Sequence, residues 1–252
     1  MSEPRADRVT VAVSEGGVAD VRLTRADKHN GLDRAMFDSL NAAIDVVAAD
    51  AEVRVVVLSG EGPSFCAGLD FKSFTAEPGR DLLGFERHDG EPENHAQRAA
   101  HGWRSLAVPV IAAVRGNALG GGLQLALAAD VRIASPDVRM SVMEIEYGLI
   151  PDMGLSRLLP GLVRDDVARE LTYTGRVVES DEALELGLVT RVEADPLAAA
   201  TELACRIAEK SPQAVRSAKR LLGEAPMLDT RRGLELEEEL QRALISASAL
   251  SG

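Results

Sequence analysis

Two glycine-rich segments, each directly after an apolar run, constrain this chain more than any other feature of its sequence. The first covers residues 60–70 and follows the apolar residues 53–59; the second covers residues 116–124 and follows residues 108–114. Glycines at the ends of buried strands let backbone N–H groups approach a ligand closely. Two such loops can aim two N–H donors at one oxygen atom, which is how an oxyanion hole is built. The spacing therefore predicts two buried strands that lead into one site for a developing negative charge.

The composition limits the classes of protein to which the chain can belong. Its 252 residues suffice for one large domain or one domain with an appendage, and 46% of them are hydrophobic. A net charge of −12 disfavours general nucleic-acid binding, which needs a basic face. Cys66 and Cys205 form no disulfide framework, and the four histidines lack metal-ligand spacing, so we expect no metal site. No stretch has the character of a signal peptide or a membrane span, so we expect a cytoplasmic protein with no membrane contact.

Hydrophobic periodicity predicts a mixed α/β chain with a helical end. Alternating valines on both sides of residues 15–17 predict an opening hairpin, and Asp33 is placed to cap the helix that follows it. Residues 72–94 are polar and aperiodic, and we expect a mobile excursion there. Segments 196–210, 212–222 and 229–249 are predicted as helices with little sheet left to cover. The sequence thus predicts a core over residues 1–194 and a helical region over residues 195–252.

In these loops and in two further segments the chain resembles the crotonase superfamily, the enoyl-CoA hydratases and isomerases. Residues 65–70 resemble the family's Phe-x-Ala-Gly-x-Asp loop, and residues 109–122 resemble its second glycine-rich loop. Residues 25–32 resemble its Arg-Pro…Asn-Ala-Leu turn. Glu144, with Gly148 and Pro151 behind it, resembles the family's catalytic glutamate segment. The resemblance covers about residues 9–222.

This resemblance implies an α/β fold, a crotonase-like spiral of ββα units with a C-terminal all-helical region that assembles a homotrimer or hexamer. It implies an acyl-CoA thioester as substrate, in fatty acid β-oxidation, with coenzyme A as part of the substrate and no separate cofactor. The family's two oxyanion donors fall on the backbone N–H groups of Leu69 and Gly121. Arg25 and Lys28 fall in the segment on the CoA side, although both are equally open to interpretation as solvated surface charges. The other residues implied at the substrate pocket are Ala67, Gly68, Asp70, Gly120 and Gln124.

The acid and base residues are where the chain departs from a family hydratase, which uses two glutamates. One position holds Glu144, but the other holds Gln124, whose amide transfers no proton at neutral pH and can only hold a water. Asp152 resembles the carboxylate that dienoyl-CoA isomerases use beside their glutamate, and it is equally placed to cap the helix after it. Since moving a double bond needs only one base, the sequence favours an enoyl-CoA or dienoyl-CoA double-bond isomerase.

Other functions stay open at the level of sequence. One is an enoyl-CoA hydratase in which Gln124 positions the water and Glu144 performs all proton transfer. Another is a non-catalytic acyl-CoA-binding protein that kept the oxyanion loops and lost turnover. A serine peptidase on the same spiral is disfavoured, because we expect no Ser/His pair at the two loops.

Overall fold

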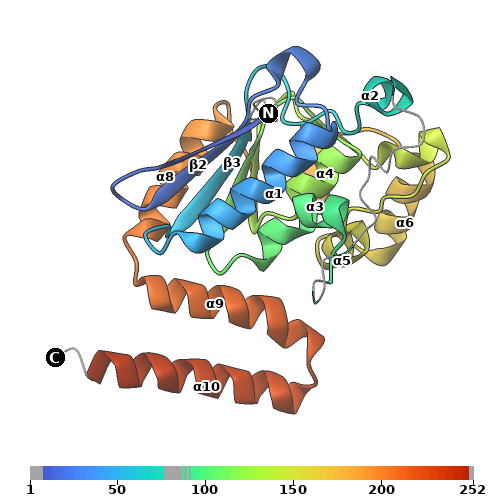
Figure 1. The fold of residues 1–252 in the computed structure, drawn as a ribbon. Helices are drawn as coiled ribbons and strands as arrows, with labels where there is room; N and C mark the ends of the chain where they lie inside the picture. Colours follow the sequence, from blue (N-terminus) through green and yellow to red (C-terminus); the bar gives the residue numbers. More distant parts are fainter. Residues whose placement is uncertain (1–7, 77–86, 88–89, 91, 250–252) are drawn as a thin grey trace.

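The structure of the chain, a computed structural model, describes residues 8–76, 87, 90 and 92–249 (Figure 1). Its strands are β1 Val9–Val13, β2 Val18–Leu23, β3 Val55–Gly60, β4 Val110–Val114, β5 Asn117–Leu119, β6 Val131–Ala134, β7 Arg139–Ser141, β8 Val178–Glu179 and β9 Arg191–Val192. Its α-helices are α1 Arg34–Ala49, α2 Phe71–Ala76, α3 His95–Ser105, α4 Gly121–Leu127, α5 Leu155–Leu158, α6 Asp165–Thr174, α7 Ser180–Leu186, α8 Pro196–Ala208, α9 Pro212–Glu224 and α10 Thr230–Ala249. Short 3-10 turns occur at η1 Ala26–Lys28, η2 Met143–Tyr147, η3 Leu159–Gly161 and η4 Ala225–Met227.

A six-stranded sheet forms the centre of the molecule, in the order β1-β2-β3-β4-β6-β9. The hairpin predicted at residues 15–17 is confirmed, because β1 and β2 pair antiparallel and Gly17 there has a φ of +79°. All the later neighbours pair parallel, from β2 with β3 to β6 with β9. Parallel neighbours need long crossovers, so each strand is followed by helices or loops that return the chain to the same end of the sheet.

A second, three-stranded sheet in the order β5-β7-β8 gives the chain its spiral. Strand β4 of the large sheet is followed at once by β5 of the small one, and β6 is followed by β7 in the same way. Gly116 makes the first of these corners with a φ of +57°, and a Cβ built there would lie 2.1 Å from the Pro63 carbonyl oxygen. The repeats β4-β5 and β6-β7 therefore each contribute one strand to each sheet before the next helical segment, as in the predicted ββα spiral.

Helices cover both faces of the large sheet, which explains the continuous apolar run of β3. Val56 and Leu58 join the main core with α1, whose predicted apolar face is buried and whose cap is confirmed by a 2.8 Å bond from Met36 N–H to Asp33. Val55 and Val57 face the other way, toward α8. A strand covered on both sides is apolar throughout rather than alternating.

Helix α8 corrects one sequence-based expectation. We expected the three C-terminal helices to have no sheet left to cover, yet α8 packs on the second face of the large sheet (Figure 1). Its buried side chains against the sheet are small alanines at helical spacing, which let the helix approach the valines and isoleucines of the sheet closely. These residues are Ala200, Ala204 and Ala208 against Val55, Val57, Ile111 and Ile133.

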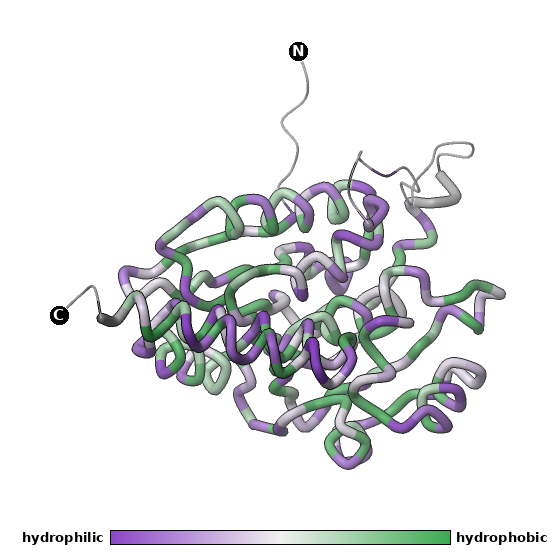
Figure 2. The backbone as a smooth tube through the Cα atoms, turned by 90° about the horizontal axis from the view of Figure 1, so that it is seen from below, coloured by the Kyte–Doolittle hydropathy of each residue, from purple (hydrophilic) through white to green (hydrophobic). Residues whose placement is uncertain are grey.

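Helices α9 and α10 form an antiparallel pair below the rest of the chain (Figure 1). Lys219 and Arg216 tie α9 to the core, through a 2.8 Å bond to the Val108 carbonyl and a 3.1 Å bond to the Val53 carbonyl. Figure 2 shows hydrophilic and hydrophobic residues alternating along α10. Leu222, Leu234 and Ile245 of this pair are exposed. The C-terminal region therefore keeps apolar side chains in contact with solvent in the single chain.

Parts of the fold had no readable signal in the sequence. The short strands β5 and β8 were not predicted separately, and α2 occupies the start of the segment predicted as a loop from residue 72. The remainder of that prediction falls largely on residues 77–86, 88–89 and 91, which lie outside the described residues. No helix among the described residues is long and apolar enough to cross a membrane.

Candidate active site

The two glycine-rich loops meet, as the sequence predicted, and the glycines are what let them do so. Cys66 N–H donates to the Asn117 carbonyl at 3.0 Å, and Leu119 N–H donates to the Cys66 carbonyl at 3.1 Å. A Cβ built on Gly122 would lie 2.1 Å from the Cys66 carbonyl oxygen, and one on Gly68 would lie 2.6 Å from the Leu119 carbonyl oxygen. Any larger residue at either position would force the loops apart.

The backbone N–H groups of Leu69 and Gly121 point away from the hydrogen bonds that the carbonyls of their own peptide units accept. In a trans peptide the C=O and N–H of one unit point in opposite directions. The Gly68 carbonyl accepts from Leu32 N–H at 2.8 Å, so the N–H of Leu69 in the same unit faces away from Leu32. The Gly120 carbonyl accepts from Gln124 N–H at 3.1 Å, so the N–H of Gly121 points out of the N-terminal end of α4.

A small pocket lies where these donors converge. Neither N–H donates to another group in the described part of the chain, so both are available to a bound oxygen atom. The predicted pocket residues that line it come from both loops, together with Glu144: Ala67, Gly68, Leu69, Gly120, Gly121 and Glu144. Two preorganised N–H donors facing one pocket form the geometry that stabilises an enolate or a tetrahedral oxyanion.

Glu144 stands on η2 at the wall of this pocket and is 7% exposed. Gly120 adjoins this carboxyl with a φ of +53°, a backbone conformation that residues with a side chain rarely adopt. Burial raises the pKa of Glu144, a hydrogen bond from Gln124 opposes the rise, and the nearby charge of Asp152 adds to it. Its Oε2 is buried and has no hydrogen-bond partner among the described residues. A carboxylate with a raised pKa and one unengaged oxygen suits a general base.

Gln124 lies behind Glu144 rather than in the pocket wall that we expected it to line. It is 1% exposed, and its Nε2 donates to Glu144 Oε1 at 2.7 Å. Its Oε1 accepts from two backbone N–H groups, of Met153 at 2.8 Å and Leu155 at 3.1 Å. Those two N–H donors fix which end of the amide is oxygen. The amide is engaged at both ends, so it links Glu144 to the segment that carries Met153 and Leu155.

Asp152 is half-buried on the segment that Gln124 holds. The alternative that it caps the next helix is not realised, because the N-cap of α5 is Gly154 and no side chain bonds there. Burial raises the pKa of Asp152, and its charge acts on Glu144. It is not among the residues that line the pocket itself. The structure thus brings a second carboxyl near the first without placing it in the same wall.

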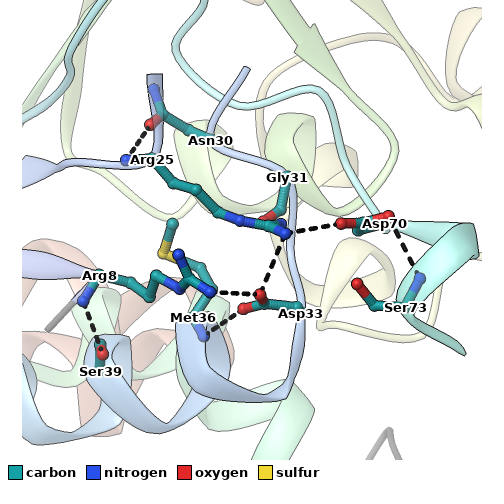
Figure 3. A network of polar contacts seen from close by, with 9 residues as sticks. All are labelled: Arg8, Arg25, Asn30, Gly31, Asp33, Met36, Ser39, Asp70 and Ser73. Carbon is teal, nitrogen blue, oxygen red and sulfur yellow. Dashed lines mark hydrogen bonds and ion pairs between the residues drawn. The ribbon is translucent and has the colours of Figure 1, made fainter. Parts of the chain in front are cut away.

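Arg25 supports the first loop through a buried network of ion pairs. The sequence left open whether Arg25 contacts coenzyme A or is a solvated surface charge. Its guanidinium is buried and lies between two carboxylates, 2.8 Å from Asp70 and 3.2 Å from Asp33 (Figure 3). Its other amino group donates to the Gly31 carbonyl at 2.9 Å. Asp70 directly follows Leu69, so this buried network ties the oxyanion loop to the N-terminus of α1. With its donors engaged in this way, Arg25 shapes the site through Asp70.

A wider groove adjoins the pocket on the side of η1. It is lined by Arg25, Lys28, Asp70 and Lys72 among others, and it shares the loop residues 67–69 and Phe71 with the pocket. Lys28 is exposed there and has no carboxylate partner in the described part of the chain. The groove therefore offers an extended ligand a path from the pocket to a cationic rim.

Other residues of the pocket were missed by sequence reasoning. Phe71 and Tyr147 face each other at its mouth with ring centroids 4.2 Å apart, and Met143 and Leu149 complete the lining. Phe71 follows the first loop, and the other three lie within the segment of Glu144 and Gly148. None of them is part of a periodic pattern, so only the fold shows that they share one pocket. Among the described residues no group of three or more His, Cys, Asp or Glu is placed to hold a metal ion.

A Ser/His pair, which we did not expect, is present at the first loop. His29 Nδ1 lies 3.0 Å from Ser64 Oγ, which also accepts a 3.0 Å bond from Asn117 Nδ2. Ser64 is 0% exposed and lines neither the pocket nor the groove. A nucleophile must reach its substrate, so this pair holds the loops together and gives no support to a peptidase.

Comparisons with known proteins agree with this geometry. A family model described as Enoyl-CoA hydratase/isomerase matches residues 14–251. The chain is 36% identical over 236 residues to YngF of Bacillus subtilis (strain 168), named as an enoyl-CoA hydratase/isomerase, covering 92% of this chain and 88% of that protein. It is 33% identical over 227 residues to the mitochondrial Delta(3,5)-Delta(2,4)-dienoyl-CoA isomerase of Rattus norvegicus, covering 87% and 69%.

Solved structures show the same fold. A Thermobifida fusca YX protein of the enoyl-CoA hydratase type, crystallised in complex with CoA, superposes with a TM-score of 0.84 at 32% identity and covers 97% of this chain and 95% of that one. Hydratases and isomerases are both among the relatives, so similarity alone does not separate the two reactions. The fold, the two N–H donors and the matched family model lead to one conclusion: the chain belongs to the enoyl-CoA hydratase/isomerase family, the crotonases.

Proposed function

We propose that this protein is an acyl-CoA double-bond isomerase that acts on an enoyl-CoA or dienoyl-CoA thioester. The observation that carries the proposal is the engagement of Gln124, whose amide is bonded at both ends. Among the described residues, Glu144 is then the one carboxyl in the pocket wall, with Asp152 nearby. Adding water across a double bond calls for one group to activate the water and another to manage the α-proton. Moving a double bond calls for one base, which the site has.

In the proposed reaction Glu144 Oε2 removes a proton from C2 of the thioester. The electron pair of that C–H bond moves toward the carbonyl, and the negative charge appears on the thioester oxygen. The N–H groups of Leu69 and Gly121 stabilise that charge, each contributing roughly 10²–10³ in rate. The positive end of the α4 dipole acts in the same direction. Protonation farther along the conjugated chain, by Glu144 or Asp152, then gives the isomer with no change in composition.

The rest of the ligand follows from the shape of the site. The acyl part enters the pocket and the CoA part follows the adjoining groove, where Lys28 faces the phosphates; Arg25 contributes by holding Asp70. The CoA-bound relative supports this placement.

The protein assembles as a homotrimer or a dimer of trimers through residues 195–252, which the exposed apolar side chains of α9 and α10 support. Light scattering that gives one chain mass, 26.8 kDa, at micromolar concentration would contradict the assembly.

One assay panel tests the reaction. The protein is incubated with 2-enoyl, 3-enoyl and 3,5-dienoyl thioesters, and each reaction is followed by absorbance and by product mass. Isomerisation of the 3-enoyl or the 3,5-dienoyl thioester at constant mass is the expected result. A fast gain of one water on the 2-enoyl thioester would replace the proposal with a hydratase that uses Glu144 alone. Binding of all three without turnover would mean a non-catalytic acyl-CoA-binding protein.

A further inference from the structure

The amide of Gln124 connects two parts of the site that are distant in sequence. Its nitrogen bonds to Glu144, twenty residues later, and its oxygen bonds to the backbone of Met153 and Leu155. The residue is 1% exposed, so these bonds are shielded from bulk solvent. All three distances, from 2.7 to 3.1 Å, are those of well-formed hydrogen bonds. A single side chain on α4 therefore holds both η2 and the segment that carries Asp152.

We propose that Gln124 is a positioning residue that fixes the Glu144 carboxyl and the Asp152 segment relative to each other, so that Glu144 presents only Oε2 to the thioester. This inference deepens the proposed function and rests on it for the role of Glu144 as the base. The amide occupies Oε1, which removes one of the two oxygens from the chemistry and prevents rotation of the carboxyl. Oε2 is left buried without a partner. Gln124 itself touches no substrate in this arrangement.

The bond from Gln124 also has an electrostatic consequence. An N–H donor stabilises the ionised carboxylate, so this bond opposes the rise in the pKa of Glu144 that burial causes. Asp152 is the titratable group whose charge acts on Glu144, and it acts in the opposite direction to the amide. Removing the donor should therefore raise the pKa of Glu144 further. A residue that only filled space or held the loop would leave that pKa unchanged.

The test uses two variants that break different parts of the arrangement. Gln124→Met is similar in size and removes the bonds at both ends. Gln124→Glu keeps an acceptor for the Met153 and Leu155 N–H groups but replaces the donor to Glu144 with a second carboxyl. Asn41→Leu is the matched control, because Asn41 is another buried amide, which donates to the His95 carbonyl at 2.9 Å between α1 and α3, away from the pocket.

Two readouts are taken for each protein. The first is the titration of Glu144 in the full chain, followed by carbon NMR with side-chain carboxyl labelling and assigned by the resonance that Glu144→Gln removes. The second is the pH profile of kcat and KM on the thioester that the panel selects. Gln124→Met should shift the Glu144 titration and the rising limb of kcat to higher pH. It should also lower kcat at neutral pH about 10- to 100-fold with little change in KM, since displacement of a base by about 1 Å has an effect of that order.

The outcomes separate this inference from the proposed function. In Gln124→Glu the Glu144 titration should also shift upward, which decides the matter if Gln124→Met does not fold. Asn41→Leu should lose thermal stability with no change in the Glu144 titration or in the rising limb of kcat. Titration of Glu144 at the wild-type pH in both Gln124 variants would overturn the positioning role. If the wild type turns over no thioester, the proposed function fails, whereas the carboxyl titration still decides the role of Gln124.

Discussion

Replacing Gly122 with alanine should disable the oxyanion hole while leaving every polar side chain of the site in place. The new Cβ would lie 2.1 Å from the Cys66 carbonyl oxygen, where ordinary contact begins at 3.4 Å. The backbone must therefore yield by more than 1 Å, and a backbone atom cannot rotate away as a flexible side chain can. Cys66 lies three residues before Leu69, so this displacement of the backbone separates the two N–H donors. Misplacement by about 1 Å lowers a rate about 10²-fold, and overpacking destabilises a fold by about 1–3 kcal/mol.

The assay is steady-state turnover of the selected thioester, with thermal unfolding measured on the same samples. We expect Gly122→Ala to lose about 10²-fold in kcat and to bind the substrate nearly as well as the wild type. Gly223→Ala is the control, since it lies in α9 with nothing within 4 Å of the new Cβ, and it should leave turnover unchanged. A folded Gly122→Ala enzyme with kcat within about threefold of wild type would refute the close-contact argument.

Three other substitutions test the surrounding groups. Because burial raises the pKa of Glu144 above its ordinary 4.5, the folded state binds that proton more tightly than the unfolded chain, and the resulting stability is lost as pH rises through the raised value. Glu144→Gln should therefore melt at a higher temperature than wild type at about pH 8, and a gain that persists unchanged at about pH 4 would contradict this. Asp152→Asn should slow isomerisation of a 3,5-dienoyl thioester by about 10²-fold and a 3-enoyl thioester much less, and equal rates would exclude the carboxyl from proton return. Arg25→Leu leaves the carboxylates of Asp33 and Asp70 without their shared partner in a buried site, so chemical denaturation should show a loss of about 3 kcal/mol, whereas an unchanged midpoint would mean that the network is dispensable.

The elements that sequence reasoning predicted well are those determined by local pattern. The hairpin at Gly17 follows from valine alternation and a glycine turn, and α1 follows from its apolar periodicity and the cap at Asp33. The meeting of the two loops was predictable because glycines directly after buried strands indicate a close approach of the backbone. In each of these cases residues that are close in sequence carry the whole argument.

What the sequence could not provide are contacts between distant residues. The bonds of Gln124 span 20 residues to Glu144 and 29 to Met153, and nothing in the local pattern distinguishes a clamped amide from one that holds water. The hydrogen bond from Arg25 to Asp70 spans 45 residues. The sequence does not show this partner, so Arg25 was open to interpretation as a phosphate contact. The packing of helix α8 on the sheet was not predicted, because the role of its alanines depends on sheet residues that are distant in sequence.

The role of Glu144 as the base between two backbone donors is the central claim, and a comparison of Glu144→Gln with wild type tests it most directly. The measurement is kcat for isomerisation of the selected thioester together with the dissociation constant of the same ligand. The glutamine keeps the size and the hydrogen bond to Gln124 but cannot accept the C2 proton. We predict that kcat falls by at least about 10²-fold while the dissociation constant stays within about threefold. A variant that isomerises the thioester within about threefold of the wild-type rate would contradict the account.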